Sequence, residues 1–390
     1  MVSLVDMTDA LKLDLEERRA DSEPSSDIFL VRGTTGRDGG FSALLGLMGE
    51  NGLKFYQSHA EGDKAGPDGL ISPDSVVIVK VNSQWDERGG TNTDLVKAIV
   101  ESITAHPEGF TGEVVIADNG QAQYGSTHHG GSLDYEKNNA EDKNQSNRLV
   151  AQSFTEHRVS IYLWDAITSN QVGEYCEGDM EDGYVIEDIK DPTGIRVSYP
   201  KFTTEQGTHI SFKLGVWDPE KGSYDSERLK LINVPVLKAH FIYGVTACVK
   251  HYMGVVSDKL QGGSAHRSVG TGGMGAEIAG TRMPTLNVLD AIWVNSTPGK
   301  GPRCSYEEAT RLNLVMAGTD PIALDHWATA NILMQAARIQ GHSDLSKFDP
   351  ENPEPDSHGV WLRLSTDTLR ESGHPVICDE ERMNIYITDA

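Results

Sequence analysis

Residues 231–254 read LINVPVLKAHFIYGVTACVKHYMG, a run that is almost wholly apolar apart from two lysines and two histidines. The run begins as a buried strand and ends in a glycine turn, so it predicts a core strand that leads into a polar site. Its polar side chains are Lys238, His240, Lys250 and His251. Charged side chains are rarely buried without a partner. A salt-bridged strand end would explain one such pair, whereas four residues within fourteen positions favour a functional site.

Burial would change the acid–base behaviour of these side chains. Desolvation lowers the pKa of a lysine or histidine, and a group that titrates near pH 7 is suited to general acid–base catalysis. We therefore predict catalytic roles for His240, Lys250 and Lys238.

The composition excludes several classes of function. A chain of 390 residues has room for two domains, or for one large domain with insertions. The net charge of −24 argues against a general nucleic-acid binder and against binding to anionic membranes. The four cysteines form no CxxC pair, so we expect neither an iron–sulfur cluster nor a structural zinc site. No secretion signal or apolar run of about 20 residues is present, and we expect a cytoplasmic protein.

The apolar segments alternate between strand and helix patterns. Residues 94–105 carry apolar side chains on one helical face, between the apolar strands 75–81 and 113–117. A strand, a helix and a strand in that order predict a parallel crossover unit. The fold class is therefore α/β, with mostly parallel sheets in two lobes around a cleft and a β-rich insertion. The predicted segments are an N-terminal helix and linker (1–27), a first α/β lobe (28–150), the insertion (151–230), a second α/β part (231–345) and a C-terminal extension (346–390).

Polar side chains stand where several predicted strands end. In parallel α/β sheets, ligands bind outside the carboxyl ends of the strands. Each residue also has a structural explanation: Asp320 has the position of a helix N-cap, and an Asp-Asn-Gly sequence is typical of a turn. Their common position favours a site, formed by Lys80, Asn82, Asp118, Asn119, Asp290 and Asp320.

The loop at 89–94 (GGTNTD) precedes a predicted helix whose first amides are free hydrogen-bond donors. Such a terminus, with the hydroxyls of Thr91 and Thr93 and the cations Lys80 and Arg88, predicts a site for a carboxylate or phosphate. Threonine is also an ordinary helix cap. Neither a Walker loop nor a GxGxxG dinucleotide motif is present.

Histidines raise the possibility of a metal ion. His128 and His129 are adjacent and therefore poorly placed to bind one ion together, whereas His251 and His266 could meet across a turn. We take His251 and His266 as candidate ligands for a divalent metal, nickel or zinc.

Several motifs together resemble the domain-of-unknown-function family 362 (DUF362). They are VKVN (79–82), GGTNT (89–93), ADN (117–119), NVPVLKAH (233–240), the following Thr246, Lys250 and Gly254, and GTDPIALD (318–325). The resemblance covers roughly residues 28–340. The family pattern usually has asparagine after the second lysine, where this chain has His251. Many members carry ferredoxin-type cysteine clusters, which this chain lacks, so the resemblance implies no electron-transfer role here.

A more distant resemblance is to the nickel-pincer lactate racemases, through the spacing of His240, Phe241, Gly244 and Lys250. It implies that His240 is an acid/base, that Lys250 carries a nickel-pincer nucleotide and that His266, sixteen residues further on, binds nickel. It also implies a two-lobed fold and a polar loop, 82–93, that holds the substrate carboxylate. The racemase SGGRK is TACVK here. Its second catalytic base has no counterpart, a role for which His129 (or the adjacent histidine) is the candidate.

Two hypotheses follow. The first is an enzyme with a metal- or cofactor-dependent acid/base site, similar to a racemase or epimerase, that acts on a small anionic molecule. The second is a non-catalytic accessory protein that binds a metal or an anion in the same place. Acid/base side chains within an apolar strand favour the enzyme.

Overall fold

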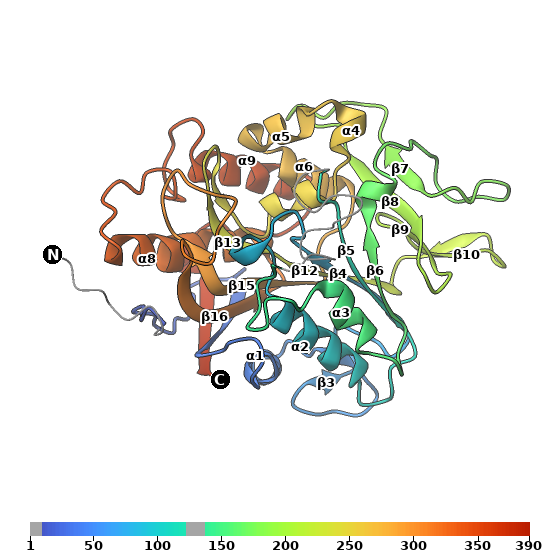
Figure 1. The fold of residues 1–390 in the computed structure, drawn as a ribbon, viewed down its shortest axis with the longest axis horizontal. Coiled ribbons are helices and arrows are strands. Elements are labelled where there is room, and N and C mark those ends of the chain that lie inside the picture. The colour runs from blue at the N-terminus through green and yellow to red at the C-terminus, as the bar shows by residue number, and fades with distance from the viewer. Residues whose placement is uncertain (1–9, 122–136) are drawn as a thin grey trace.

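The computed structural model describes residues 10–121 and 137–390, and its centre is a ten-stranded sheet (Figure 1). Eight strands form its continuous order, and the short pair β13–β14 joins it beside β15. In that order they are β17 (Met383–Asp389), β1 (Ser26–Arg32), β16 (Thr310–Gly318), β15 (Leu286–Asn295), β12 (Leu229–Val234), β4 (Val76–Val81), β5 (Glu113–Asp118) and β6 (Val159–Leu163). The additional pair is β13 (Val236–His240) and β14 (Gly244–Thr246).

The central sheet is mostly parallel. β12 pairs in parallel with both β4 and β15, and β5 pairs in parallel with β4 and β6. β16 runs against both of its neighbours, β15 and β1, while β1 and β17 are parallel. The carboxyl ends of β4, β5, β12, β13 and β15 therefore meet at one edge of the sheet, and that of β16 lies at the opposite edge.

Alternation along the strands creates a core on each face of the sheet. Val77 and Val79 of β4 belong to a core under one set of helices, and Val76 and Ile78 belong to a second core on the other face. Successive side chains of a strand point to opposite faces, so a strand that is apolar throughout must be covered on both. In Figure 1, α1 (Gly40–Glu50), α2 (Thr93–Thr104) and α3 (Asn147–Gln152) lie on one side of the sheet.

The other side carries helices and a second sheet. This second sheet is antiparallel and consists of β7 (Gly183–Ile186), β8 (Ser198–Thr203), β9 (His209–Ser211), β10 (Gly215–Asp218) and β11 (Ser223–Asp225). Beside it lie α4 (Asp258–Gln261), α5 (Ser264–Ser268), α6 (Gly273–Gly280) and α9 (His358–Glu371) (Figure 1). A third core packs under α7 (Pro321–Ala328) and α8 (Met334–Ile339). A small parallel pair, β2 (Tyr56–Gln57) and β3 (Ala65–Gly66), completes the strands.

The predicted α/β class with a mostly parallel central sheet is confirmed, and the structure adds a separate antiparallel sheet. In the central sheet, β16, β15 and β12 of the later segment lie between β1 and β4 of the segment 28–150, so these two segments share one core. Most of the predicted β-rich insertion forms the antiparallel sheet, but β6 joins the central sheet as its edge strand. The C-terminal extension supplies α9 and the opposite edge strand, β17.

The predicted N-terminal helix has no counterpart in residues 10–25, which run as irregular or extended chain. Leu11, Leu13 and Leu15 pack against the core under α7 and α8. Their spacing of two residues is that of an extended segment, and it outweighs the helix propensity of the neighbouring charged residues. Arg18 forms a bridge to Ile385 of β17.

Over the described ranges, the structure contains no helix that combines the length and the apolar character needed to cross a lipid bilayer.

Candidate functional site

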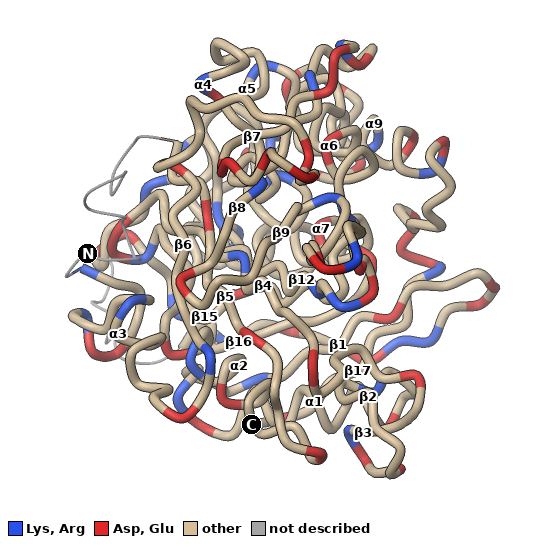
Figure 2. Tube along the Cα trace, turned by 90° about the vertical axis from the view of Figure 1, so that its right-hand side faces the viewer, with Lys and Arg blue, Asp and Glu red and all other residues tan. Residues whose placement is uncertain are grey.

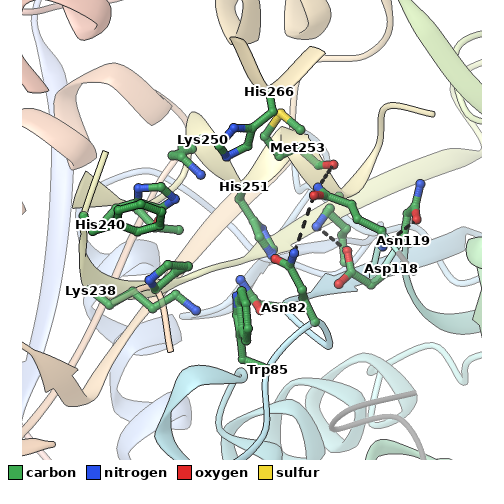
Figure 3. A pocket seen from close by; sticks show the side chains of 17 residues that line it. Asn82, Trp85, Asp118, Asn119, Lys238, His240, Lys250, His251, Met253 and His266 are labelled. Atoms are coloured by element: carbon green, nitrogen blue, oxygen red, sulfur yellow. Dashed lines mark hydrogen bonds and ion pairs between the residues drawn. The ribbon is translucent and has the colours of Figure 1, made fainter. Parts of the chain in front are cut away.

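A polar pocket of about 240 Å³ lies at the edge where the parallel strands end. Figure 3 shows its labelled side chains converging from the ends of β4 and β5, from β13 and from the segment after β14. The lining residues are Lys80, Asn82, Gln84, Trp85, Asp118, Asn119, Gln121, Lys238, His240, Phe241, Thr246, Lys250, His251, Met253, Gly254, His266 and Pro302. The two lysines and two histidines of the 231–254 run thus share one pocket with polar groups from the first half of the chain.

The 231–254 run reaches the pocket by a strand, a hairpin and a tight helical turn. β13 carries Lys238 and His240 and pairs with the antiparallel β14. β14 begins at Gly244, whose φ of +75° suits glycine, and a Cβ there would overlap the carbonyl of Lys347. Lys250 and His251 come from a 3₁₀ helix after β14, not from the strand itself.

Lys80 and Asp118 form a buried ion pair between neighbouring strands. Lys80 Nζ donates to Asp118 Oδ1 at 2.7 Å. The other carboxylate oxygen of Asp118 accepts from the backbone N–H (2.8 Å) and the hydroxyl (3.0 Å) of Ser83. Burial lowers the pKa of Lys80 and raises that of Asp118, and the attraction between the two groups opposes both shifts. Gly254 leaves room for the pair, since a Cβ there would overlap both side chains.

Two further buried lysines have pKa values near neutral pH. Burial lowers the pKa of Lys238 to about 7 and that of Lys250 to about 7. Lys238 Nζ donates to the carbonyl oxygen of Gly89. Lys250 Nζ lies 5.7 Å from the centroid of the Tyr243 ring, and Asp258 partly offsets its pKa shift. Both lysines can therefore either carry a positive charge or accept a proton near pH 7.

His240 and His266 lie on the side of Lys250. Their ring centroids are 5.9 Å apart, and both rings contact Tyr243. Burial, and then the charge of Lys250, lowers the pKa of His266 to about 4 and that of His240 further. Nδ1 of His240 accepts from the backbone N–H groups of Ile242 (3.1 Å) and Tyr243 (3.3 Å). Both imidazoles are therefore neutral at pH 7.

His251 is buried beside the lysines. Its Nδ1 lies 2.7 Å from Asn233 Oδ1, and its Nε2 is buried without a hydrogen-bond partner in the described chain. Burial, and next the charge of Lys80, keeps its pKa well below the usual value.

Two other lining residues have buried polar atoms that lack hydrogen-bond partners within the described ranges. They are Trp85, through Nε1, and Thr246, through Oγ1. Buried polar groups are nearly always hydrogen-bonded in folded proteins, so these atoms around one pocket are available to hydrogen-bond a ligand. Sequence reasoning missed Trp85 and gave Thr246 no role; the available signal for Trp85 is a lone tryptophan in the polar loop after β4.

The predicted anion site at the start of α2 is filled by the protein itself. Thr91 Oγ1 donates to the carbonyl of Val234 (2.7 Å), and Thr93 Oγ1 donates to that of Gln145 (2.8 Å). Arg88 donates to Asn139 Oδ1 (2.9 Å) and lies over the Trp293 ring. None of these three predicted residues lines the pocket.

The carboxylate at that helix terminus is Asp290, which accepts from the backbone N–H of Asn92 at 2.8 Å. Asp290 lies within β15, at an irregularity in its pairing, and not at its end as predicted. Burial raises its pKa to about 6. The N-cap residue of α2 thus already binds an internal anion, and the side-chain oxygen of Asn92 accepts from the amides of Asp94 and Leu95 in the first turn.

Asp320 does not share the edge of the other residues. It caps α7 by accepting from the backbone N–H groups of Ile322 (2.9 Å) and Ala323 (3.1 Å). Because β16 is antiparallel, its carboxyl end lies at the opposite edge of the sheet. The expectation of a common strand-end position is therefore wrong for Asp320.

Asn82 and Asn119 do line the pocket. The side chain of Asn119 is used to hold the fold, since Nδ2 donates to Tyr184 OH (3.0 Å) and to the carbonyl of Val256 (2.9 Å).

The metal prediction receives no further geometric support. His251 and His266 line the same pocket. However, residues 10–121 and 137–390 contain no group of three His, Cys, Asp or Glu side chains placed to hold a metal ion. His128 and His129 lie outside the described residues, so the prediction for His129 stays a prediction.

The pocket contrasts with the rest of the molecule in charge. Figure 2 shows acidic residues scattered along the whole trace, with basic residues interspersed. Within the pocket, one carboxylate faces three lysines, and that carboxylate is already paired. The interior site is therefore rich in cations and hydrogen-bond donors although the chain has a net charge of −24.

Comparison with known families supports one of the two resemblances. Residues 226–330 match the model of the family described as "Domain of unknown function (DUF362)". The matched segment runs from β12 to α7 and contains Lys238, His240, Lys250, His251 and His266. Neither the curated proteins nor the solved structures yielded a match to this chain.

Proposed function

We propose that this protein is an enzyme that binds a small anion in the lysine-rich pocket and transfers a proton to or from it. The observation that carries the proposal is the convergence of Lys80, Lys238 and Lys250 with three histidines around one cavity of about 240 Å³. Pockets that enclose drug-sized ligands span about 300–1,000 Å³, so this cavity suits a smaller molecule.

The lysines would bind and stabilise the anion. Ammonium groups that are already oriented in a water-poor site stabilise negative charge that develops in a transition state. Removal of a C–H proton from a carboxylate substrate, for instance, creates an enolate, whose added charge Lys238 and Lys250 would face. Return of a proton to the same carbon, from either side, completes an exchange, racemisation or epimerisation. His240 and His251 are the side chains that would move the proton.

In a second version of this proposal, the enzyme depends on a metal ion or a nickel-pincer nucleotide held at Lys250 and His266. The described residues offer no three-ligand group, and the cavity is smaller than those that usually enclose larger ligands. We therefore derive no step through either group. Elemental analysis and intact mass of protein from its native host would reveal either one, as stoichiometric metal or as an adduct on Lys250.

The test uses a panel of small carboxylates, hydroxy acids and phosphates. Thermal-shift and calorimetric titrations identify the anions that bind, and proton NMR in D₂O follows loss of each ligand's C–H signals. We expect Lys238→Met and Lys250→Met to weaken binding and abolish exchange. Lys97→Met, which removes an exposed lysine of α2, is the matched control.

Each outcome is decisive. Binding that depends on the pocket lysines, together with exchange, supports the enzyme. Tight binding without exchange for any ligand of the panel supports the non-catalytic accessory protein. Binding that Lys97→Met weakens as much as Lys250→Met contradicts both assignments to this pocket.

A further inference from the structure

The most informative group in the pocket is the imidazole of His251, because the residues behind it determine where its proton lies. We infer that Asn287 and Asn233 form a chain of amides that holds His251 with its proton on Nδ1, which makes the bare Nε2 the proton acceptor of the pocket. The accepting role rests on the proposed function. The position of the proton, and its cause, do not.

The chain begins at the carbonyl groups that follow β16. Asn287 Nδ2 donates to the carbonyl oxygens of Gly318 (3.3 Å) and Thr319 (3.5 Å). A carbonyl oxygen can only accept, so the NH₂ group of Asn287 faces these two oxygens and its Oδ1 faces the other way. Both asparagines are fully buried, which leaves no water-exposed alternative.

Asn233 passes this orientation on. Its Nδ2 donates to Asn287 Oδ1 at 2.9 Å and to the carbonyl of Cys248 at 3.2 Å. Asn233 Oδ1 therefore faces His251 Nδ1, at 2.7 Å. Because an amide oxygen can only accept, Nδ1 must carry the proton, and the neutral ring has a lone pair on Nε2. That nitrogen is buried and lacks a partner in the described residues, on a side chain that lines the pocket.

The opposite tautomer is disfavoured. It would donate from the ring to the carbonyl oxygen of Val81, which lies nearby. That oxygen also accepts from Lys80 Nζ at 3.2 Å, and its second lone pair is open to the ring, so the obstacle to this tautomer lies in the amides. The change would reverse Asn233 and then Asn287, and the oxygen of Asn287 would face two carbonyl oxygens. Such a repulsive contact in a buried site is costly.

His240 is held in the opposite tautomer to His251. Its Nδ1 accepts from two backbone N–H groups, those of Ile242 and Tyr243. In the neutral ring the proton is therefore on Nε2. The pocket thus contains two imidazoles in opposite tautomers: His251 offers a lone pair, and His240 offers an N–H. A proton acceptor and a proton donor thus belong to two neutral side chains that line one pocket.

The experiment reads the tautomers directly. Protein labelled with ¹⁵N at histidine gives long-range ¹H–¹⁵N correlations that distinguish a protonated ring nitrogen from a bare one. His251→Gln and His240→Gln identify the two signals. We expect a protonated Nδ1 and a bare Nε2 for His251, and the reverse for His240. A proton on Nε2 of His251 in the unmodified protein overturns the inference.

Variants test the cause. Asn287→Leu removes the shorter of the two bonds that orient the amide of Asn233 and leaves the one to the carbonyl of Cys248, so His251 should mix with the Nε2–H tautomer. Asn233→Asp keeps an acceptor beside Nδ1 and should retain the original tautomer. Asn295→Leu removes a buried amide from the same strand, β15, without a contact to His251, and should change nothing. Retention of the Nδ1–H tautomer in Asn287→Leu overturns the role of Asn287. If that variant fails to fold, loss of the Nδ1–H tautomer in Asn233→Asp overturns the inference instead.

The spectra require no ligand, so they decide the tautomers even if no anion binds and the proposed function fails. If exchange activity is found, Asn287→Leu should lower its rate about tenfold or more, by analogy with groups that orient catalytic or ligating histidines. Its affinity for the anion should not change, because Asn287 does not line the pocket. If Asn287→Leu lowers the affinity for the anion by the same factor as the exchange rate, Asn287 acts through general packing and not through the position of the proton.

Discussion

Lys250 is a buried cation whose protonation depends on its surroundings. Burial lowers its pKa from 10.5 to about 7. In the unfolded chain the same ammonium titrates near its ordinary value of about 10.4. Between these two pH values the unfolded state binds more protons than the folded state, so the free energy of unfolding rises with pH from about 7 to about 10.4. The cost of burying the charge is complete below pH 7.

This cost predicts the pH dependence of a Lys250→Met variant. Relative to the unmodified protein, we expect the variant to gain stability at pH 6 and to lose that advantage steadily towards pH 9. Urea unfolding at both pH values measures the difference, and Lys97→Met controls for net charge. A difference between Lys250→Met and the unmodified protein that is the same at pH 6 and pH 9 would show that Lys250 is not buried as an ammonium.

The short helical turn after β14 depends on one glycine. A methyl group at Gly254 would overlap the carboxylate of Asp118 and the ammonium of Lys80. We expect Gly254→Ala to destabilise the fold by about 1–3 kcal/mol, as overpacking of a buried site does, and to weaken anion binding. Thermal unfolding and calorimetry measure the two effects.

Gly46→Ala is the control for that substitution. Gly46 lies in α1 with only Lys64 Cε near a new Cβ, at 3.9 Å, so this variant should be neutral or slightly stabilising. If Gly254→Ala is as stable as Gly46→Ala and binds normally, the ion pair does not need the space that Gly254 leaves.

Asp320, at the start of α7, stabilises the fold but lies away from the pocket. Asp320 caps the helix and also accepts from Ser26 Oγ (2.6 Å) and from the backbone N–H of Ile377 (2.7 Å). Loss of an N-cap costs about 1 kcal/mol, and two further bonds disappear with it. We expect Asp320→Ala to unfold at lower denaturant concentration but to bind anions normally. Weakened binding in the folded variant would contradict its place at the far edge of the sheet.

At the scale of the whole molecule, the two ends of the described chain meet in one sheet. β17 pairs with β1 along seven residues, from Ser26 with Met383 to Arg32 with Asp389. Removal of residues 383–390 would expose the edge of β1 and part of the core under α7. We therefore expect this truncation to lower the melting temperature of the entire protein in one transition. A truncated chain that retained the original melting temperature would show that β17 is dispensable.

Local sequence predicted the elements because each is defined by its own pattern. Apolar runs at 75–81 and 113–117 marked β4 and β5, and the amphipathic period at 94–105 marked α2. The same local signals identified Lys238, His240, Lys250 and His251 as unusual. The prediction of an N-terminal helix fails over residues 10–25, because this charged segment with good helix propensity also has a two-residue apolar spacing.

Sequence by itself thus determined the α/β class, the positions of the core elements β4, β5 and α2, and the run of residues from which the site draws most of its cations and histidines. Tertiary structure alone decided how these residues meet. The reversed direction of β16 sends Asp320 away from the pocket, and Asp290 takes the place that an external anion was expected to fill. The proton of His251 follows from Asn287 and Gly318, which are distant in sequence. Strand order and hydrogen-bond direction are long-range properties, so no local pattern encodes them.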